Sequence, residues 1–269
     1  MIILVPMGGK GSRFSKAGYK TNKASILTTD RHTGVKLPMV VCAMKDIPGT
    51  NNSKNKIVCI DRELHQKNGT EEIIRKHFKE VIFIHDHIML DQGYACFLAR
   101  EYLNSNDELF IGACDNGIEI DLNSFELAKE RADVLMISHT NDQNIYQNPE
   151  AHSWAELESN SKTLSSISLK KTVSKNPMSD HATTGMFWFK HANLFLKYLK
   201  KMIEKKDMLE GKYYVDKVIQ YFIDEGFVVQ YFDVKYLCWG TPKEYEDYEE
   251  ILKYWNKFYN NEKWLKKSQ

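Results

Sequence analysis

Short apolar runs alternate with amphipathic stretches along the first half of the chain. Apolar runs typical of buried β-strands lie at residues 2–5, 57–60, 81–85, 109–114 and 132–140. Between them, apolar side chains recur at helical spacing near residues 71–78 and 90–102. Strands that alternate with helices favour a mainly parallel sheet covered on both faces. We therefore expect a Rossmann-like three-layer α/β sandwich.

The pattern changes after residue 140. Three β-like stretches follow one another without helices between them, at residues 154–158, 165–173 and 182–190. Helical and strand patterns then return at residues 191–205, 215–224, 227–234 and from 243 onward. Aromatic residues among the lysines of residues 253–267 indicate an amphipathic helix that packs on the body. We expect one domain of three parts: residues 1–140, a β-rich insertion within 141–241, and a helical segment at 242–269.

Charge and composition exclude several classes of partner. The 269-residue chain carries 37 basic and 36 acidic residues, which argues against nucleic-acid binding. No apolar run approaches the ~20 residues of a membrane span, so we expect no membrane partner. The five cysteines show no paired spacing, as is typical of a reducing compartment. Because the N-terminus also lacks a signal-peptide pattern, we expect a cytoplasmic protein.

The first apolar run ends in a glycine-rich turn, Gly-Gly-Lys-Gly-Ser-Arg at residues 8–13. Glycine lets unpaired backbone N–H groups approach phosphate oxygens closely, and Arg13, Lys20 and Lys23 add positive charge. The turn matches neither the P-loop nor the dinucleotide fingerprint, since Phe14 stands where the latter needs glycine. A polyphosphate site is our interpretation, and a plain tight turn is the alternative.

The turn and the lysine after it have a more specific parallel. The stretch Gly-x-Gly-Ser-Arg-Phe at residues 9–14, followed by Lys23, resembles the signature loop of the sugar-phosphate nucleotidyltransferases. The family's Pro-Lys appears here as Asn22-Lys23, and an insertion before the Lys-Leu-Pro-Met at residues 36–39 suggests an elongated hairpin. The resemblance implies catalytic roles for Arg13 and Lys23. It also implies nucleotide binding by Met7, Gly8, Gly9, Gly11 and Ser12.

Asp115 follows the apolar run at residues 109–114. A carboxylate at the carboxyl edge of an open α/β sheet lies on the ligand side, where it can hold Mg²⁺ that bridges phosphates. The alternative is an ordinary Asp-Asn-Gly turn; the resemblance supports the metal and catalytic role. It also implies that Gln92 and Gly93 contact the nucleobase, although these residues equally fit a plain helix N-terminus.

The resemblance continues into the second half, which would form the acceptor-binding half beside a nucleotide-binding first half. The residues that it places at the acceptor are Lys171, His181, Gly185, Asp216 and Trp239. The structural alternatives are a solvated lysine pair for Lys171, a capped turn for His181 and a helix cap for Asp216, and the aromatic residues after Gly185 favour a buried core. The main departure is Cys238, which replaces a frequent second metal aspartate. Since Mg²⁺ prefers oxygen to a thiol, Asp233 is the candidate replacement.

These motifs together predict a nucleotidyltransferase of the Rossmann-like, glycosyltransferase-A-like type, with Mg²⁺ as cofactor. Its partners would be an NTP and a small phosphorylated acceptor, with a homo-oligomer left open. The family suggests a sugar 1-phosphate for a bacterial capsule or other surface polysaccharide. The changes at Thr172, Lys212 and Cys238 leave room for phosphocholine, and the base stays open. The rivals are a metal-dependent glycosyltransferase and a silent sugar-nucleotide sensor.

Overall fold

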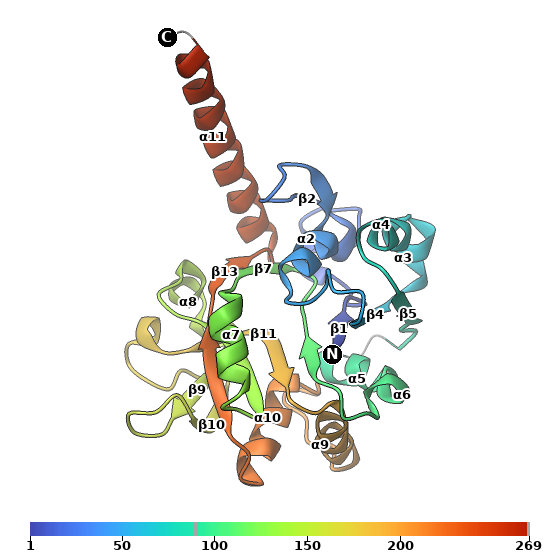
Figure 1. Ribbon diagram of the computed structural model, residues 1–269, viewed down its shortest axis with the longest axis vertical. Helices are drawn as coiled ribbons and strands as arrows, with labels where there is room; N and C mark the ends of the chain where they lie inside the picture. The colour runs from blue at the N-terminus through green and yellow to red at the C-terminus, as the bar shows by residue number, and fades with distance from the viewer. Residues whose placement is uncertain (89–90, 268–269) are drawn as a thin grey trace.

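The computed structural model describes the backbone of residues 1–88 and 91–267 and, within these ranges, the side chains as far as residue 257 (Figure 1). Its centre is a nine-stranded sheet. Four neighbouring strands form a parallel part, in the order β5 (Val81–His85), β4 (Lys56–Asp61), β1 (Ile2–Pro6) and β6 (Leu109–Ile111). This part contains the strands that four of the five apolar runs of the first half predict, and the fifth run, at residues 132–140, forms a strand in the rest of the sheet.

The rest of the sheet is built around β11 (Ala182–Phe189), which pairs antiparallel with β6. β11 also pairs antiparallel with β8 (Val134–His139), and β12 (Val229–Asp233) lies parallel to β8. The antiparallel pair β9 (Ser153–Leu157) and β10 (Leu164–Leu169) extends the sheet next to β11. The expected β-rich insertion is thus confirmed, and it adds antiparallel strands to the parallel sheet.

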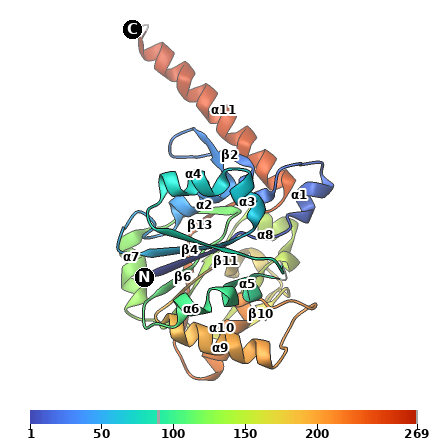
Figure 2. The same ribbon diagram turned by 90° about the vertical axis from the view of Figure 1, so that its right-hand side faces the viewer.

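Helices cover both faces of the sheet and make the three layers visible in Figure 2. One face packs against α5 (Gln92–Leu98), α6 (Arg100–Leu103), α9 (Ala192–Glu204) and α10 (Val215–Asp224). The other packs against α2 (Met39–Asp46), α4 (Thr70–His77) and α7 (Leu122–Lys129). Because β1 is buried on both faces, Ile2 and Leu4 join the first core and Ile3 and Val5 the second. The three-layer prediction is confirmed.

Two small antiparallel ladders lie outside the central sheet. β2 (Leu27–Thr29) pairs with β3 (Lys36–Pro38), which confirms the expected hairpin before α2. β7 (Asn116–Glu119) pairs with β13 (Lys235–Cys238) and joins the chain after Asp115 to the chain before α11. The remaining helices are short: α1 (Ser12–Lys16), α3 (Glu63–Lys67) and α8 (Gln143–Gln147).

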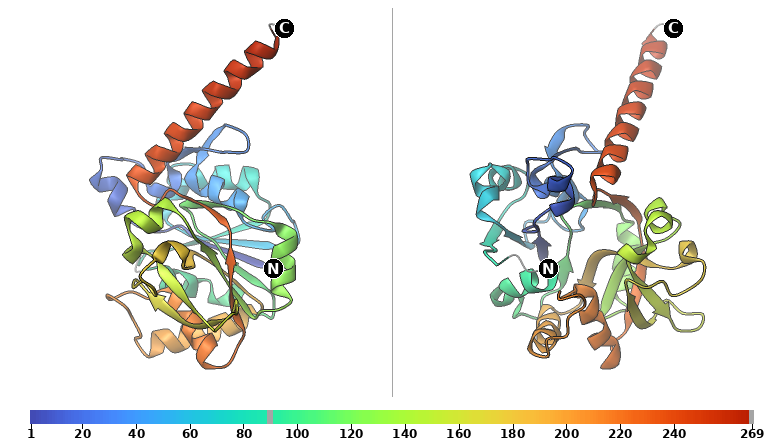
Figure 3. Two further views of the ribbon diagram at one scale, coloured as in Figure 1. Left: turned by 90° about the vertical axis from the view of Figure 1, so that its left-hand side faces the viewer. Right: turned by 180° about the vertical axis from the view of Figure 1, so that it is seen from behind.

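Helix α11 (Pro242–Lys267) projects away from the body (Figures 1 and 3). Its first turns are anchored on the body, where the hydroxyls of Tyr245 and Tyr248 donate to the carbonyls of Leu27 and Thr29. Among the described side chains beyond them, Tyr254 and Trp255 are 64% and 58% exposed. The prediction that residues 253–267 pack on the body is therefore wrong as far as Lys257, because the side chains of residues 253–257 are all exposed.

Some element boundaries also differ from the sequence-based ones. The strand expected at 109–114 ends at Ile111, and the helix expected at 90–102 is divided at Ala99 into α5 and α6. The start expected at residue 90 lies outside the described residues. Cys42, Cys59 and Cys96 are buried and unpaired, as expected. None of the described helices is long and apolar enough to cross a membrane.

Candidate active site

A cavity of about 600 Å³ opens where β1, β5 and β6 end. Its wall combines the turn after β1, the start of α5, the chain after β6, and segments of the second half of the sequence. Ten of the residues singled out in the sequence line this cavity: Met7, Gly8, Gly9, Gly11, Ser12, Arg13, Lys23, Gln92, Asp115 and Gly185. The long-range assembly of these residues makes the cavity the candidate site.

The turn after β1 presents its backbone toward the cavity. Gly11 has φ 61°, a left-handed conformation that favours glycine, and it precedes the first residue of α1. A Cβ at Gly11 would lie 3.1 Å from the Cβ of Lys23, so the absent side chain also allows close packing. From Gly8 to Gly11, no backbone N–H donates to an acceptor in the described part of the chain. Such N–H groups can bind an anion.

Lys23 and Asp115 form the charged centre of the cavity. The Lys23 ammonium contacts Asp115 Oδ2 and also donates to the carbonyl of Gly240 at 3.0 Å. Burial alone would raise the pKa of Asp115, but the charge and hydrogen bond of Lys23, with Arg13 farther away, hold that pKa below its usual value. Asp115 is therefore an ionised carboxylate at neutral pH, suited to an electrostatic role.

Asn22, which stands where the family has proline, ties the glycine turn to its surroundings. Its Nδ2 donates to the carbonyl of Gly9 at 3.3 Å, and its Oδ1 accepts from Ala24 N–H at 3.2 Å. His65 Nδ1 accepts from the Arg62 N–H, which leaves Nε2–H to donate to Asn22 Oδ1 at 3.0 Å. Burial lowers the pKa of His65 to about 4, so this imidazole is neutral. Asn22 thus replaces the rigidity of proline with hydrogen bonds.

The second half of the chain closes the opposite side of the cavity at a bulge in β11. The pairing of β11 with β8 shifts between Thr183 and Met186, and Gly185 there has φ +80°. Gln92 Nε2 donates to the Gly185 carbonyl at 3.3 Å. Asn116 Nδ2 donates to the Thr184 carbonyl at 3.0 Å. These bonds connect the two halves across the cavity.

Three candidate residues serve packing next to the cavity and are not part of its wall. Gly93 donates its N–H to the Tyr213 carbonyl at 2.9 Å, and a Cβ there would lie 2.6 Å from that oxygen. Trp239 is 1% exposed, and its backbone N–H donates to the Asp115 carbonyl at 2.9 Å. Asp216 is 5% exposed, and burial raises its pKa to about 6. Gly93 and Trp239 therefore hold segments next to the cavity wall, whereas Asp216 is a buried residue at the start of α10.

The other predicted acceptor and metal residues lie elsewhere. Lys171 is exposed in the turn after β10 and does not line the cavity. His181 stacks on Tyr231, and its Nδ1 lies 2.9 Å from Asp233 Oδ1. That same oxygen accepts from Ser138 Oγ at 2.6 Å. Asp233 is thus held by neighbours on the sheet and is not on the wall that carries Asp115.

Cys238 lies close to a carboxylate that the sequence analysis missed. Its Sγ is 3.2 Å from Glu244 Oε2, and the same oxygen accepts from Thr241 N–H at 2.7 Å. Glu244 N–H lies 3.3 Å from Thr241 Oγ1, so this pair caps α11 at its first turn. Burial, followed by the charge of Glu244, raises the pKa of Cys238 to about 12. The thiol therefore stays protonated and is a poor metal ligand.

Further wall residues were not singled out as site residues: Lys10, Asp86, Asp91, Asn116, Thr184, Lys212 and Gly240. Asp86 directly follows the parallel strand β5, and Asn116 follows Asp115 at the start of β7, a signal that could have identified both. Lys212 carried no such signal. It reaches the cavity because the turn before α10 folds against the start of α5, where Asp91 Oδ2 accepts from Tyr213 N–H at 3.0 Å.

Comparison with solved structures identifies the class to which this fold belongs. The chain is similar to the nucleoside-diphosphate-sugar pyrophosphorylase from Vibrio cholerae RC9, with a TM-score of 0.71 and 17% identity over 92% of this chain and 99% of that one. It is also similar to UDP-glucose pyrophosphorylase, solved with UDP-glucose, with a TM-score of 0.69 and 12% identity over 95% of this chain and 98% of that one. A third similar structure is the inositol-1-phosphate CTP transferase from T. maritima, with a TM-score of 0.62 and 17% identity over 94% of this chain and 96% of that one.

The chain therefore has the fold of the sugar-phosphate nucleotidyltransferases, as its motifs predicted. No protein-family model matches the sequence. No curated protein matches it either. At these identities the similarity establishes the fold, and the reaction has to be argued from the cavity.

Proposed function

We propose that this protein is a nucleotidyltransferase, which joins the NMP unit of an NTP to a small phosphorylated acceptor and releases pyrophosphate. The observation that carries the proposal is the Lys23–Asp115 pair beside the unpaired N–H groups of residues 8–11, within one cavity. A cation, an ionised carboxylate and an anion-binding turn are the parts that phosphoryl-type transfer needs. The fold supports the same class of reaction.

The proposed chemistry is a single in-line displacement. An acceptor phosphate oxygen bonds to the α-phosphorus as the bond from that phosphorus to the pyrophosphate oxygen breaks. The acceptor is already anionic at neutral pH, so no protein base has to remove a proton. Lys23 neutralises charge that develops on the transferred group, while the turn and Arg13 orient the leaving pyrophosphate. Catalysis then consists of positioning and electrostatics.

We also propose that Asp115 would hold Mg²⁺, which would supply positive charge that screens the phosphates. The residues present fit this ion in part: Asp115 is ionised and Lys23 contacts only one of its two carboxylate oxygens. Mg²⁺ commonly takes one or two carboxylates and completes its shell with phosphate oxygens and water. The protonated thiol of Cys238 does not suit it. Asp115 is accordingly the protein ligand in this proposal.

For the acceptor, we propose a sugar 1-phosphate that feeds a surface polysaccharide, with phosphocholine as the smaller alternative. Two wall features support a phosphorylated acceptor beside the bulge of β11. Gly185 leaves the backbone open, since no atom lies within 4 Å of where its Cβ would be. Lys212 supplies a cation on the same wall, where the family motif has an acid. Lys212 thus takes the role that the sequence analysis gave to Lys171.

The geometry disfavours the glycosyltransferase alternative. That class usually carries an Asp-x-Asp pair, whereas this chain has Asp115-Asn116-Gly117. The Asn116 amide is already engaged with the Thr184 carbonyl. A Cβ at Gly117 would lie 2.6 Å from Asp46 Oδ2 and 3.2 Å from the Trp239 ring, so a carboxylate has no room there.

The deciding experiment measures pyrophosphate release with Mg²⁺ from ATP, CTP, GTP, UTP and dTTP, each against a panel of acceptors. The panel contains hexose and heptose 1-phosphates, inositol phosphate and phosphocholine. Release that requires one nucleotide and one acceptor together would support the proposal and name both substrates. Nucleotide binding without release from any pair would support the sensor instead, and hydrolysis of UDP-sugars would support a glycosyltransferase.

A further inference from the structure

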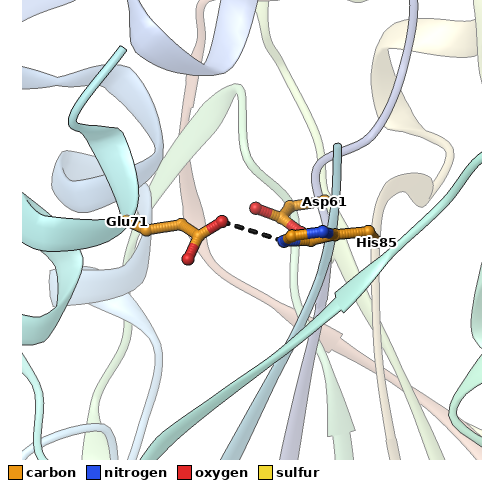
Figure 4. Close-up of side chains that lie close together, drawn as sticks. All are labelled: Asp61, Glu71 and His85. Carbon is orange, nitrogen blue, oxygen red and sulfur yellow. Dashed lines mark hydrogen bonds and ion pairs between the residues drawn. The ribbon is translucent and has the colours of Figure 1, made fainter. Parts of the chain in front are cut away.

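A second group of polar side chains lies outside the cavity, at the ends of two neighbouring strands. Asp61 is the last residue of β4, His85 is the last residue of β5, and the two are paired in register. Glu71 reaches them from α4, and Figure 4 shows the three side chains pointing toward one another. His85 Nε2 lies 3.0 Å from Glu71 Oε1 and 3.6 Å from Asp61 Oδ1. One ligand atom from each lies within 4.8 Å of the others.

The two carboxylates of this cluster are buried and lack a balancing positive charge. Asp61 is 0% exposed and Glu71 is 7% exposed. Neither carboxylate oxygen of Asp61 accepts a hydrogen bond from any residue that the structure describes. Among the described residues, the only basic side chains within 4.0 Å of either carboxylate are those of His65 and His85. Two buried carboxylates without a cation are costly, so the cluster needs either a proton or a metal ion.

His65 does not supply the missing charge. Its Nδ1 lies 3.9 Å from Asp61 Oδ2, too far for a hydrogen bond, and that nitrogen already accepts from Arg62 N–H. Burial and the neighbouring Glu71 raise the pKa of Asp61, as expected for two carboxylates placed together without a cation. Metal ions commonly displace protons from such ligands.

We propose that Asp61, Glu71 and His85 bind one divalent transition-metal cation, and that Zn²⁺ is the best match. Zn²⁺ bonds to carboxylate oxygen and imidazole nitrogen are about 2.0–2.2 Å long, which puts tetrahedral ligand atoms about 3.4 Å apart. The 3.0 and 3.6 Å separations bracket that value. Ca²⁺ would need about six to eight oxygens, and Mg²⁺ an oxygen-rich octahedron, which this donor set does not provide.

The position of the cluster gives the ion a structural role. The Asp61 carbonyl accepts from Asp86 N–H at 2.6 Å, and it lies 3.4 Å from where a Cβ of Gly8 would be. An ion that joins β4, β5 and α4 would therefore stiffen the sheet edge behind the glycine turn. His85 is 26% exposed at its side chain, which leaves a path for the ion and for a water as the fourth ligand. This site is independent of the proposed reaction.

The test is Zn²⁺ binding to the full chain after dialysis against a chelator, measured by competition with a chromogenic zinc indicator. We expect one tightly bound equivalent and a rise in melting temperature on binding. Glu71→Gln and His85→Gln should each weaken binding by at least about tenfold and remove the thermal shift. The matched controls on α4 are Glu72→Gln and His77→Gln, which alter exposed side chains and should bind as the wild type does.

Two results would overturn the proposal. One is the absence of a stoichiometric Zn²⁺ site in the wild type; the other is unchanged affinity in Glu71→Gln. A Glu71→Gln variant that is more stable than the zinc-free wild type, with no binding in either protein, would show that the pair holds only a proton. If the variants fail to fold, Co²⁺ added to the wild type decides the question. Strong visible absorption of tetrahedral Co²⁺ is expected, and its absence would refute the site.

Discussion

The two sides of the cavity are built in different ways. One side is a continuous turn between β1 and α1, completed by Lys23 and by Asp115 after β6. The other side is assembled from single residues on distant elements, among them Gly185 in β11, Lys212 before α10 and Gly240 before α11. The first side therefore has a shape fixed by local backbone geometry. The second can change its specificity through point substitutions without disturbing the turn.

This difference predicts where substitutions should affect the reaction and where they should affect the choice of acceptor. The charged pair on the first side should be needed with every substrate. Substitution of a lysine on the second side should change the binding of one substrate only.

Asp115→Asn should abolish Mg²⁺-dependent pyrophosphate release. The amide keeps the size of the side chain but removes the charge that pairs with Lys23 and that would hold the metal. Steady-state assays give the rate, and circular dichroism checks the fold. Asp121→Asn is the control, because Asp121 caps α7 and asparagine caps equally well. Full activity in Asp115→Asn would remove this residue from the mechanism.

Lys23→Ala should reduce the rate on the order of a hundredfold or more, as expected for a lost transition-state donor. The loss should appear in kcat with every nucleotide and acceptor, because the ammonium faces Asp115 and not one particular substrate. Lys16→Ala, at an exposed lysine of α1 that does not line the cavity, is the control. A change within about twofold for Lys23→Ala would contradict the assigned role.

Lys212→Ala should raise the KM for the acceptor by about tenfold and leave the KM for the nucleotide unchanged, as for one lost charged hydrogen bond. Lys171→Ala provides the matched comparison, since both lysines are exposed but only Lys212 lines the cavity. The sequence motif favours Lys171 and the structure favours Lys212. If Lys171→Ala raises the KM for the acceptor more than Lys212→Ala does, the assignment from the sequence motif is correct.

Two buried histidines extend the comparison to stability. His65→Phe, behind the glycine turn, loses its bonds to Asn22 and Arg62 and should destabilise the fold by about 2 kcal/mol. His139→Phe, in β8, should cost less than about 1 kcal/mol, because neither ring nitrogen has a hydrogen-bond partner among the described residues. Chemical denaturation at pH 7 measures both. Equal losses of stability in the two variants would contradict this expected difference.

The pH dependence of stability tests the burial of His139 separately. Burial lowers the pKa of His139 to about 3, so on acidification the unfolded chain takes up a proton that the folded protein refuses. The free energy of unfolding should therefore fall as the pH drops from the ordinary histidine pKa of about 6.5 toward 3. Between pH 7 and pH 5, His139→Phe should lose less stability than the wild type does. An identical pH dependence in the two proteins would show that His139 does not contribute.

Much of the first side could be predicted because its signals are local. A strand followed by glycines fixes both the position of residues 8–13 and their exposed N–H groups, and Asp115 follows the end of a neighbouring parallel strand. The predicted residues of the second side fared differently. Of Lys171, His181, Gly185, Asp216 and Trp239, only Gly185 lines the cavity.

The sequence alone predicts the layered α/β fold, the glycine turn and the place of Asp115 at the ligand edge of the sheet, whereas the contact between Lys23 and Asp115 is seen only in the structure. These follow from apolar periodicity and from the direction of parallel strands, which are properties of short segments. Only the tertiary structure decided that Lys212 reaches the cavity and that Asp233 pairs with His181. The tertiary structure also places the buried side chains of Asp61 and Glu71 next to His85. Those contacts join residues far apart in the chain, and their geometry depends on how helices and strands pack.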